Sequence, residues 1–355
     1  MPGQDPVASF EAVDLDTPLP LDRLAAQLAT RRVVFIGENH DRYDHHLNQL
    51  EIIRRLYQLD PNLAIGVEYF PQTAQPSLDD YIAGRTTEQE FLRASGYYAS
   101  WGYDYRLYEP IFRYAREQRI PVRALNVPSD LPSSVAKVGM AGLSTAQRAR
   151  LPMEFGPADD AYRSRLRAAF EGHKTAQPGA FDRFVEAQLV WDESMAESAS
   201  VYVNANPGRR LVVLAGSGHL AFGSGIPQRL ERRAHVNYAI VLNGADEIDR
   251  HMADYLVLGD KQQLPPAGIL GVSLEEKNGE GRIRSLTPNG AAAKAGLKAG
   301  DILTDINGET VKNVADMRLA LWDRKPGDRV RVTVRRKHAL PRTFTIDLAA
   351  PDSGA

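Results

Sequence analysis

Residues 33–57 read VVFIGENHDRYDHHLNQLEIIRRLY, and this stretch decides the fold of the amino-terminal part of the chain. Its apolar start is typical of a buried strand, and its amphipathic second half is typical of a helix. Glu38 and His40 lie between the two, at the carboxyl end of the expected strand. Gly37 is expected to let the backbone turn sharply there, because glycine has no Cβ. A metal, a haem or a substrate would bind at such a position.

The same alternation of short apolar runs and longer amphipathic stretches continues to about residue 260. The runs expected to form buried strands are 33–37, 63–68, 122–127, 211–215 and 238–242. The stretches expected to form helices include 45–58, 107–118, 157–170 and 179–204. Strands that alternate with helices predict the α/β fold class, with a layered, mostly parallel sheet flanked by helices. Such sheets bind ligands beyond the carboxyl ends of their strands.

A different pattern begins after residue 260, where the connector KQQLPPAG contains two prolines. The expected strands become shorter and are separated by glycines, and one helix is expected at 314–323. The chain of 355 residues also exceeds the ~100–200 residues usual for one domain. We therefore expect two domains, 1–260 with the α/β fold and 261–355 as a smaller module.

Composition limits the function classes that the chain can serve. Its 43 basic and 45 acidic residues give a net charge of −2 without long blocks of either sign, so nucleic acid is not an expected partner. Cysteine is absent, which excludes disulfides and thiolate metal sites. The longest uncharged stretch beside a strand, 211–226, is too short to span a bilayer, so no transmembrane segment is expected. No signal peptide is visible either, so either the protein stays inside the cell or this is a mature form whose leader was removed.

Two further strand ends repeat the arrangement at Glu38 and His40. LVVLAGSGH ends in His219, and LAIGVEYF carries Glu68 near its end. In a parallel sheet these strand ends can meet in one crevice. Imidazole and carboxylate groups together ligate Zn²⁺ or Mn²⁺, and a histidine with a carboxylate partner can act as a general base. Glu38, His40, Glu68 and His219 are therefore candidate metal ligands, and candidate catalytic residues if the protein is a hydrolase. The alternative for each is that it only forms ordinary hydrogen bonds in the fold.

Two helical residues extend the set of candidates. His46 is expected to face inward near the same end of the sheet, where a core histidine with satisfied hydrogen bonds is the simpler interpretation, while His45 is expected to face solvent. Asp192 interrupts an apolar face of the helix expected at 179–204. A buried carboxylate costs several kcal/mol, as an order of magnitude, unless it is paired. Asp192 should therefore meet a cation, a histidine or a metal, or else an arginine of the core.

The segment 97–108, YYASWGYDYRLY, contains six tyrosine or tryptophan residues. Aromatic side chains at this density usually pack beneath a loop, but they would also suit a flat macrocycle with a tyrosine phenolate as axial ligand to ferric iron. Arg42 and Arg106 lie where they could offer charge to propionates or another anionic group. The candidate tyrosines are Tyr97, Tyr98, Tyr103, Tyr105 and Tyr108.

The carboxyl-terminal module carries the clearest motifs. ILGVSL at 269–274 is followed by IRSLTPNGAAAKAGLKAGDILTDINGETV, and residues 266–348 resemble a PDZ domain of the bacterial protease-associated type. The resemblance implies that a peptide adds to the domain as an extra strand, with the helix expected at 314–323 as the other wall of the groove. Backbone N–H groups of the loop before the first strand would bind the peptide carboxylate; this loop comprises Ile269, Leu270, Gly271 and Val272.

The motifs GENHDRYDHH, GVEYF, QLVWDESMA and GSGH resemble the ChaN family over about residues 20–258, within a wider group that contains Tiki proteases and erythromycin esterases. The resemblance implies haem binding through a tyrosine ligand, a role in haem and iron uptake, and pairing of two copies around the haem as a homodimer. It also implies a periplasmic or outer-membrane-associated lipoprotein, although no lipid-bearing cysteine is present and a cytoplasmic location stays open.

Our leading interpretation is a haem-binding protein of ChaN type whose PDZ module docks a peptide or a protein C-terminus. The alternative is a metal-dependent hydrolase that uses zinc or manganese, and a third reading is a non-catalytic adaptor. The residues that would contact haem are His40, His46, Tyr97, Tyr98, Tyr103, Tyr105, Arg106, Asp192 and His219.

Overall fold

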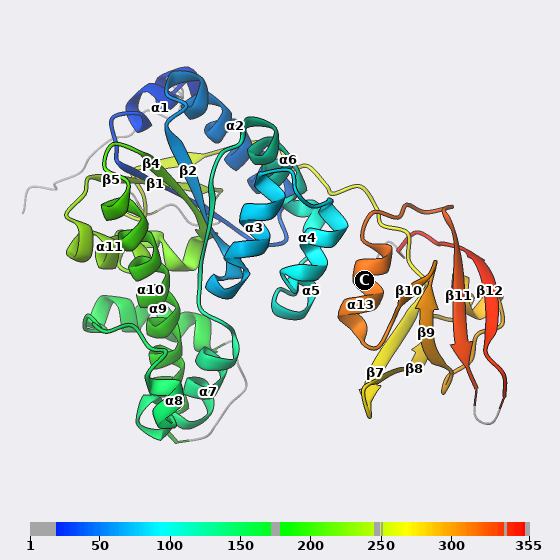
Figure 1. The fold of residues 1–355 in the computed structure, drawn as a ribbon. Helices are drawn as coiled ribbons and strands as arrows, with labels where there is room; N and C mark the ends of the chain where they lie inside the picture. The colour runs from blue at the N-terminus through cyan, green and yellow to red at the C-terminus, as the bar shows by residue number, and fades with distance from the viewer. Residues whose placement is uncertain (1–18, 172–177, 245–248, 250, 337–338, 352–355) are drawn as a thin grey trace, which may run out of the picture.

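A computed structural model describes residues 19–171, 178–244, 249, 251–336 and 339–351 of the chain (Figure 1). Within these residues the chain forms two sheets with different architecture. The amino-terminal sheet is parallel and carries helices on its faces, and the carboxyl-terminal sheet is antiparallel. The expected α/β fold class with a smaller second module is therefore confirmed.

The first sheet has the strand order β3-β2-β4-β1-β5-β6, and all its neighbours pair in parallel. Its strands are β1 (Val33–Glu38), β2 (Leu63–Pro71), β3 (Val122–Asn126), β4 (Arg210–Gly216), β5 (Tyr238–Asn243) and β6 (Tyr255–Val257). The first five match the five apolar runs of the sequence. β6, at the sheet edge, has only half-buried side chains and was not expected.

Helices surround this sheet and also form an extension beyond it (Figure 1). Their bounds are α1 (Leu21–Leu28), α2 (Tyr43–Leu59), α3 (Gln75–Ile82), α4 (Glu88–Ala94), α5 (Tyr97–Ser100), α6 (Glu109–Gln118), α7 (Asp130–Val138), α8 (Thr145–Arg148), α9 (Asp160–Glu171), α10 (Ala180–Ala205) and α11 (Ile226–Ala234). Short 3-10 turns connect several of them, and one of these, Ser217–His219, follows β4 directly. The extension consists of α7, α8, α9 and the first half of α10. Of these, α7, α9 and α10 contribute to two apolar clusters of their own.

Both faces of the parallel sheet are buried, and this is why its strands are continuous apolar runs. In β1, Val34 and Ile36 join the core beneath α1, α2 and α6, whereas Val33 and Phe35 pack toward α10 and α11 on the other face. Successive side chains of a strand point to opposite faces, so each apolar residue of the run has a layer to cover it. The sheet is thereby held between two helical layers, with its carboxyl edge left for a ligand.

Gly37 serves a different purpose from the one expected. It is the fifth residue of β1, and it is not among the glycines with positive φ, so the backbone makes no sharp turn there. A Cβ on Gly37 would instead lie 2.4 Å from Leu242 Cδ2 and 3.0 Å from Ser217 Oγ. Glycine is required because a neighbouring strand's side chain and the turn after β4 approach the backbone closely.

The carboxyl-terminal sheet has the order β12-β11-β9-β8-β7, with β10 paired to β9. Its strands are β7 (Val272–Lys277), β8 (Glu280–Leu286), β9 (Ile302–Ile306), β10 (Glu309–Thr310), β11 (Arg329–Arg335) and β12 (Arg342–Asp347), and its helices are α12 (Ala291–Lys294) and α13 (Val314–Leu321). The helix expected at 314–323 is thus present, and β7 is an edge strand. Among the described residues, no helix is both long and apolar enough to cross a bilayer.

Candidate functional site

A pocket of about 360 Å³ lies at the carboxyl edge of the parallel sheet. It opens beyond β1, β2 and β4, which are neighbours in the sheet, so their ends converge as the sequence suggested. The lining is mostly aromatic and polar. It consists of His40, Glu68, Tyr69, Pro71, Ser100, Trp101, Gly102, Tyr103, Asn126, Val127, Ser129, Trp191 and His219.

Glu38 and His40 form a hydrogen-bonded pair on one side of this pocket. Glu38 Oε1 lies 2.5 Å from His40 Nδ1, and the Glu38 carboxylate is fully buried while the His40 side chain is 23% exposed. Burial raises the pKa of Glu38. Burial opposes the charge on His40, but the hydrogen bond to Glu38 and the nearby Glu68 outweigh it and raise the pKa of His40. The pair therefore retains its shared proton to a higher pH than either group would alone.

His219, which also lines the pocket, makes a second imidazole–carboxylate pair. Its Nδ1 lies 2.6 Å from Asp192 Oδ1, and the hydroxyl of Tyr162 donates to Asp192 Oδ2 at 2.6 Å. Burial disfavours the charged imidazole, but Glu68 and Asp192 overcome this effect and raise the pKa of His219 to about 9. Asp192 therefore meets a histidine, one of the partners expected for a carboxylate on the apolar face of α10.

Glu68 lies between the two histidines. Its Oε2 accepts a hydrogen bond of 2.7 Å from the backbone N–H of Gly216, and its Oε1 is 3.5 Å from His219 Nε2. A Cβ on Gly216 would lie 2.9 Å from His40 Cε1, so glycine is needed at the end of β4 to let His40 approach. The structure thus brings Glu38, His40, Glu68 and His219 to one site.

His46 is buried beside this site but does not line the pocket. Its Nδ1 is 3.1 Å from Gln49 Oε1, its Nε2 is 3.3 Å from the carbonyl oxygen of His40, and burial lowers its pKa to about 4. It supports the backbone at His40 as a neutral core histidine. The expectation that His45 faces solvent is wrong: His45 is buried, and its Nδ1 accepts from the N–H of Asn39, because the chain folds back over the start of α2.

The aromatic segment 97–108 is divided among three places. Tyr97, Tyr105 and Tyr108 are fully buried in the core, where Tyr105 donates to Glu88 and Tyr108 to the carbonyl of His40. Tyr98 lines a separate groove in the second module. Tyr103 is 37% exposed at the mouth of the pocket, with its ring centroid 4.9 Å from that of His40.

The two arginines expected to meet an anionic ligand are engaged elsewhere. Arg42 donates to both carboxylate oxygens of Asp44, at 2.9 and 2.5 Å. Arg106 pairs with Asp104 and donates to the carbonyl oxygen of Pro265 at 2.9 Å. Neither lines the aromatic pocket.

The metal alternative is not supported by the arrangement. No group of three or more His, Asp or Glu side chains positioned to hold an ion occurs in the part of the chain that the structure describes. The physical reason is that the carboxylates are turned toward other partners: Glu38 toward His40, Asp192 toward His219 and Tyr162, and Glu68 toward the N–H of Gly216. Zinc or manganese is therefore not retained as a cofactor.

Three residues of the site were missed in the sequence. Tyr162 was hidden within an amphipathic helix, where nothing indicated that its hydroxyl would reach Asp192. Trp191 precedes Asp192 and lines the pocket, and its position beside a buried carboxylate could have been noticed. Trp101, whose ring centroid lies 4.9 Å from that of His40, belongs to the aromatic segment, but nothing in the sequence distinguishes it from the other aromatic residues there.

The pair formed by His219 and Asp192 predicts a pH-dependent stability. The folded-state pKa of about 9 lies above the unfolded value of about 6.5, so the charged imidazole stabilises the fold fully below about pH 6.5. This contribution is lost as the pH rises through about 9. We expect the free energy of unfolding, measured by urea titration, to fall by about 1–3 kcal/mol across that interval.

Two variants isolate this effect from other titrations. Asp192→Asn should flatten the pH dependence, because it removes one of the carboxylates that favour the charged imidazole. The matched control is His235→Asn, at an exposed position in the left-handed region where asparagine is well tolerated. A steep pH dependence that persists in Asp192→Asn would contradict the assignment.

The second module carries a groove of about 500 Å³ between β7 and α13. Its lining includes Leu270, Val272, Met317 and Leu321, together with the expected loop residues Ile269 and Gly271. Gly271 has φ of +72°, and within the described residues the N–H groups of Leu270 and Gly271 have no backbone acceptor. A turn that leaves successive N–H groups free forms a concavity for anions.

Comparisons with known proteins agree with both halves of this description. The family model described as "Haem-binding uptake, Tiki superfamily, ChaN" matches residues 24–230, and the PDZ domain model matches residues 268–348. The structure titled "Cofacial heme binding to ChaN of Campylobacter jejuni" superimposes with a TM-score of 0.55 and 20% identity, covering 67% of this chain and 91% of that one. This structural similarity supports the α/β fold of the amino-terminal domain.

Curated relatives match parts of the chain. Protein RETICULATA-RELATED 5, chloroplastic, of Arabidopsis thaliana is 26% identical over 232 residues, which are 59% of this chain and 31% of the relative. A probable periplasmic serine endoprotease DegP-like of Brucella suis is 42% identical over 72 residues, which are 20% of this chain and 14% of the relative. The chain thus spans no more than about a third of the length of these relatives.

Proposed function

The chain belongs to the ChaN family of haem-binding uptake proteins in the Tiki superfamily, and from this premise we propose that it binds haem at the mouth of the aromatic pocket and takes part in haem uptake. The observation that carries the proposal is the exposed Tyr103 beside His40. Phenolate and imidazole are both axial ligands of haem iron in proteins. The site therefore offers two ligand types at one opening.

The side chains around Tyr103 are suited to contact a flat macrocycle such as haem. Trp101 lies with its ring centroid 5.7 Å from that of Tyr103 and offers apolar surface at the same opening. Burial and the carboxylates of Asp41, Glu38 and Glu68 raise the pKa of Tyr103, so its phenolate needs a cation to form near neutral pH. When bound, ferric haem would supply that charge. Tyr97 and Tyr105 are enclosed by the core and lack this access.

The size of the pocket favours binding at the mouth. Its volume of about 360 Å³ is near the lower limit of ligand pockets, so a macrocycle would lie across the opening and keep one face exposed. A second copy of the chain could cover that face, and we include such a homodimer in the proposal. We also propose a periplasmic location, on the resemblance to the family alone.

A titration with haemin tests the proposal. We expect micromolar haemin to give a shifted Soret band with saturation at one haem per chain, or one per two chains if the copies share it. Sedimentation with and without haemin then distinguishes the two stoichiometries. A spectrum equal to that of free haemin at every protein concentration would refute haem binding.

We propose in addition that the second module docks a peptide carboxyl terminus. Its edge strand β7 has no neighbour on the side of α13 in the described sheet, so a peptide can add there as a further strand. The free N–H groups of Leu270 and Gly271 would bind the terminal carboxylate. The apolar side chains of the groove would receive the last side chain of the peptide.

A second candidate function is favoured by the pair of His219 and Asp192. A buried carboxylate that orients an imidazole, itself reaching a pocket, is the arrangement of a general base. Such a site would hydrolyse an ester or amide without a metal, with the His40 and Glu38 pair at the same pocket. Because the pKa of His219 is raised to about 9, the free imidazole would be available only in alkaline solution.

Hydrolysis of p-nitrophenyl acetate in the presence of a chelator tests this candidate. We expect the rate to rise toward about pH 9 and to fall by at least ~100-fold in His219→Ala, which is the lower end of the usual contribution of a general base. His235→Asn, at an exposed position whose left-handed backbone tolerates asparagine, serves as the control. A rate that is equal in both variants would exclude this function.

A further inference from the structure

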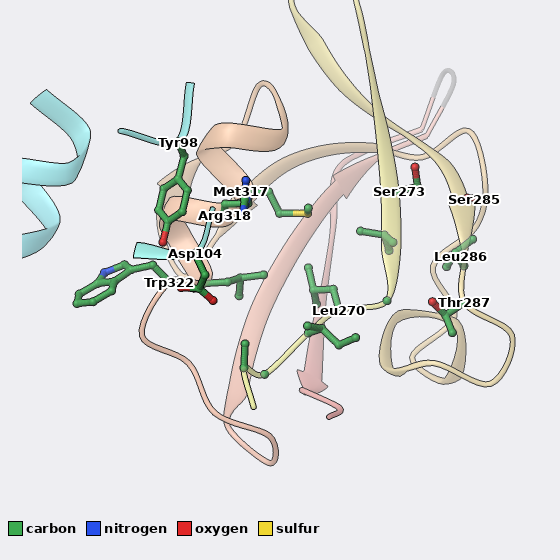
Figure 2. Close-up of a pocket in the computed structure, with 16 residues that line it drawn as sticks. Tyr98, Asp104, Leu270, Ser273, Ser285, Leu286, Thr287, Met317, Arg318 and Trp322 are labelled. Atoms are coloured by element: carbon green, nitrogen blue, oxygen red, sulfur yellow. The ribbon is translucent and has the colours of Figure 1, made fainter. Parts of the chain in front are cut away.

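Two residues of the amino-terminal domain line the peptide groove of the PDZ domain. The groove is formed by α13, by the loop that contains Gly271 and by β7, and its lining also includes Tyr98 and Asp104 (Figure 2). Tyr98 lies on α5, and Asp104 lies in the loop that precedes the 3-10 turn Tyr105–Leu107. The groove of this chain is therefore built from two domains.

The contact that brings these residues to the groove is extensive and specific. The guanidinium of Arg318 lies 5.1 Å above the ring centroid of Tyr98, and the ring of Trp322 packs on Tyr105 at 5.7 Å. Arg93 on α4 also forms an ion pair with Glu309 of the PDZ domain. Leu319 of α13 belongs to the apolar core of the first domain. Helix α13 thus packs on the first domain with one face and lines the groove with the other.

The charges of the groove indicate which peptide it would select. Asp104 is neutralised by Arg106, with 2.6 Å between Oδ2 and Nη2. Arg318 is held over Tyr98, and no carboxylate lies within ion-pair distance of it among the described residues. The remaining lining is largely apolar, with Leu270, Val272, Leu286, Met317 and Leu321. An apolar last side chain and an acidic side chain upstream of it would match this surface.

We propose that the peptide site is a two-domain site, in which Tyr98 contacts the bound peptide and Arg318, held in place by Tyr98, selects an acidic side chain near its carboxyl terminus. The proposal rests on the peptide docking proposed above. It gives the first domain a direct part in peptide recognition. Tyr98 is half-buried at the groove, so a bound peptide can cover the rest of its ring, and tyrosine is enriched among the residues that dominate binding energy once they are desolvated.

The test uses the full chain and labelled heptapeptides that end in a free Val, Leu or Phe, with either Glu or Lys two residues before the end. Fluorescence anisotropy measures the Kd of each peptide. We expect wild type to prefer Glu over Lys, and Tyr98→Ala to weaken the best peptide by roughly 5- to 30-fold. Tyr114→Ala, at a half-buried tyrosine on α6 that is absent from the groove, should leave the Kd unchanged.

Arg318→Gln provides a second measurement that does not depend on the packing of Tyr98. It should abolish the preference for Glu over Lys while the circular dichroism spectrum stays that of wild type. If a peptide binds but its Kd in Tyr98→Ala is within two-fold of wild type, or the preference persists in Arg318→Gln, the two-domain site is refuted and simple PDZ docking survives. If no peptide of the panel binds to wild type, the docking proposal fails together with this inference.

Discussion

Replacement of Glu193 by leucine should destabilise the first domain by about 3–5 kcal/mol. Glu193 follows Asp192 on α10 and is fully buried. Its carboxylate meets three arginines of α11: Arg229 at 3.1 Å, Arg232 at 3.0 Å and Arg233 at 2.5 Å. Removing the single anion would leave these cations without compensation, and the side chain of Arg229 is itself only 2% exposed. A buried charge without a partner lowers the free energy of unfolding more than the loss of an intact ion pair does.

The carboxylate of Glu193 also fixes the backbone near the extension. It accepts a hydrogen bond of 2.6 Å from the N–H of Gly156. A Cβ on Gly156 would lie 2.0 Å from Arg232 Nη1, so the loop fits closely around the ion network. The variant should therefore loosen the extension as well as α11. Urea unfolding followed by tryptophan fluorescence, to which Trp191 contributes from two residues before Glu193, reports on both changes.

A matched control separates burial from charge. Glu51→Leu removes an acidic residue that pairs with Arg55 on the exposed surface of α2, where an ion pair contributes about 0–1 kcal/mol. Adding Arg229→Met to Glu193→Leu should recover part of the loss, because an apolar pair of similar volume carries no uncompensated charge. Equal unfolding free energies for Glu193→Leu and Glu51→Leu would show that the buried network adds no net stability.

The ion network also explains how far the sequence could predict α10. Asp192 interrupts an apolar face of the helix, so its buried carboxylate requires a partner. The sequence predicts either a cation, a histidine or a metal, or else an arginine of the core. The structure uses both solutions on adjacent residues: Asp192 meets His219, and Glu193 meets the arginines. The helical periodicity of the sequence shows that the carboxylate of Asp192 is buried. Its partner lies more than twenty residues away in the chain, so the identity of the partner depends on tertiary packing.

The strands were predictable for a simple physical reason. A parallel sheet buried on both faces requires continuous apolar runs, and such runs are conspicuous in a sequence of average polarity. The sequence does not predict the short helices α3, α4, α5 and α7, because four to nine residues give too little periodicity to separate a helix from a loop. The edge strand β6 was missed because its side chains are only half-buried.

The aromatic segment shows where sequence reasoning ends. In the sequence, residues 97–108 form one aromatic cluster, and every tyrosine in it is an equal candidate for a haem ligand. The fold sends Tyr97 and Tyr105 into the core, Tyr98 to the peptide groove and Tyr103 to the pocket. Side chains in a loop do not alternate with a fixed period, so only the tertiary structure shows which tyrosine enters the core, the groove or the pocket. This division is what makes one tyrosine the principal candidate for a ligand.

Tyr103→Phe should weaken haemin binding at least ~10-fold, which corresponds to about 1.4 kcal/mol. The substitution removes only the phenolic oxygen, and the ring can keep its contacts with His40 and Trp101. Its effect therefore reports on ligation rather than on packing, and the Soret and charge-transfer bands should change together with the Kd. His40→Ala should also weaken binding, because it removes both an imidazole and the partner of Glu38.

The control for this comparison is Tyr114→Phe, which removes a phenolic oxygen from a half-buried tyrosine on α6 that does not line the pocket. It should bind haemin as wild type does. If Tyr103→Phe keeps both the Kd and the spectrum while His40→Ala loses them, the histidine is the ligand and the tyrosine is only a neighbour. If both variants bind haemin within two-fold of wild type, neither Tyr103 nor His40 ligates the iron, and the proposed haem site at the mouth of this pocket is refuted.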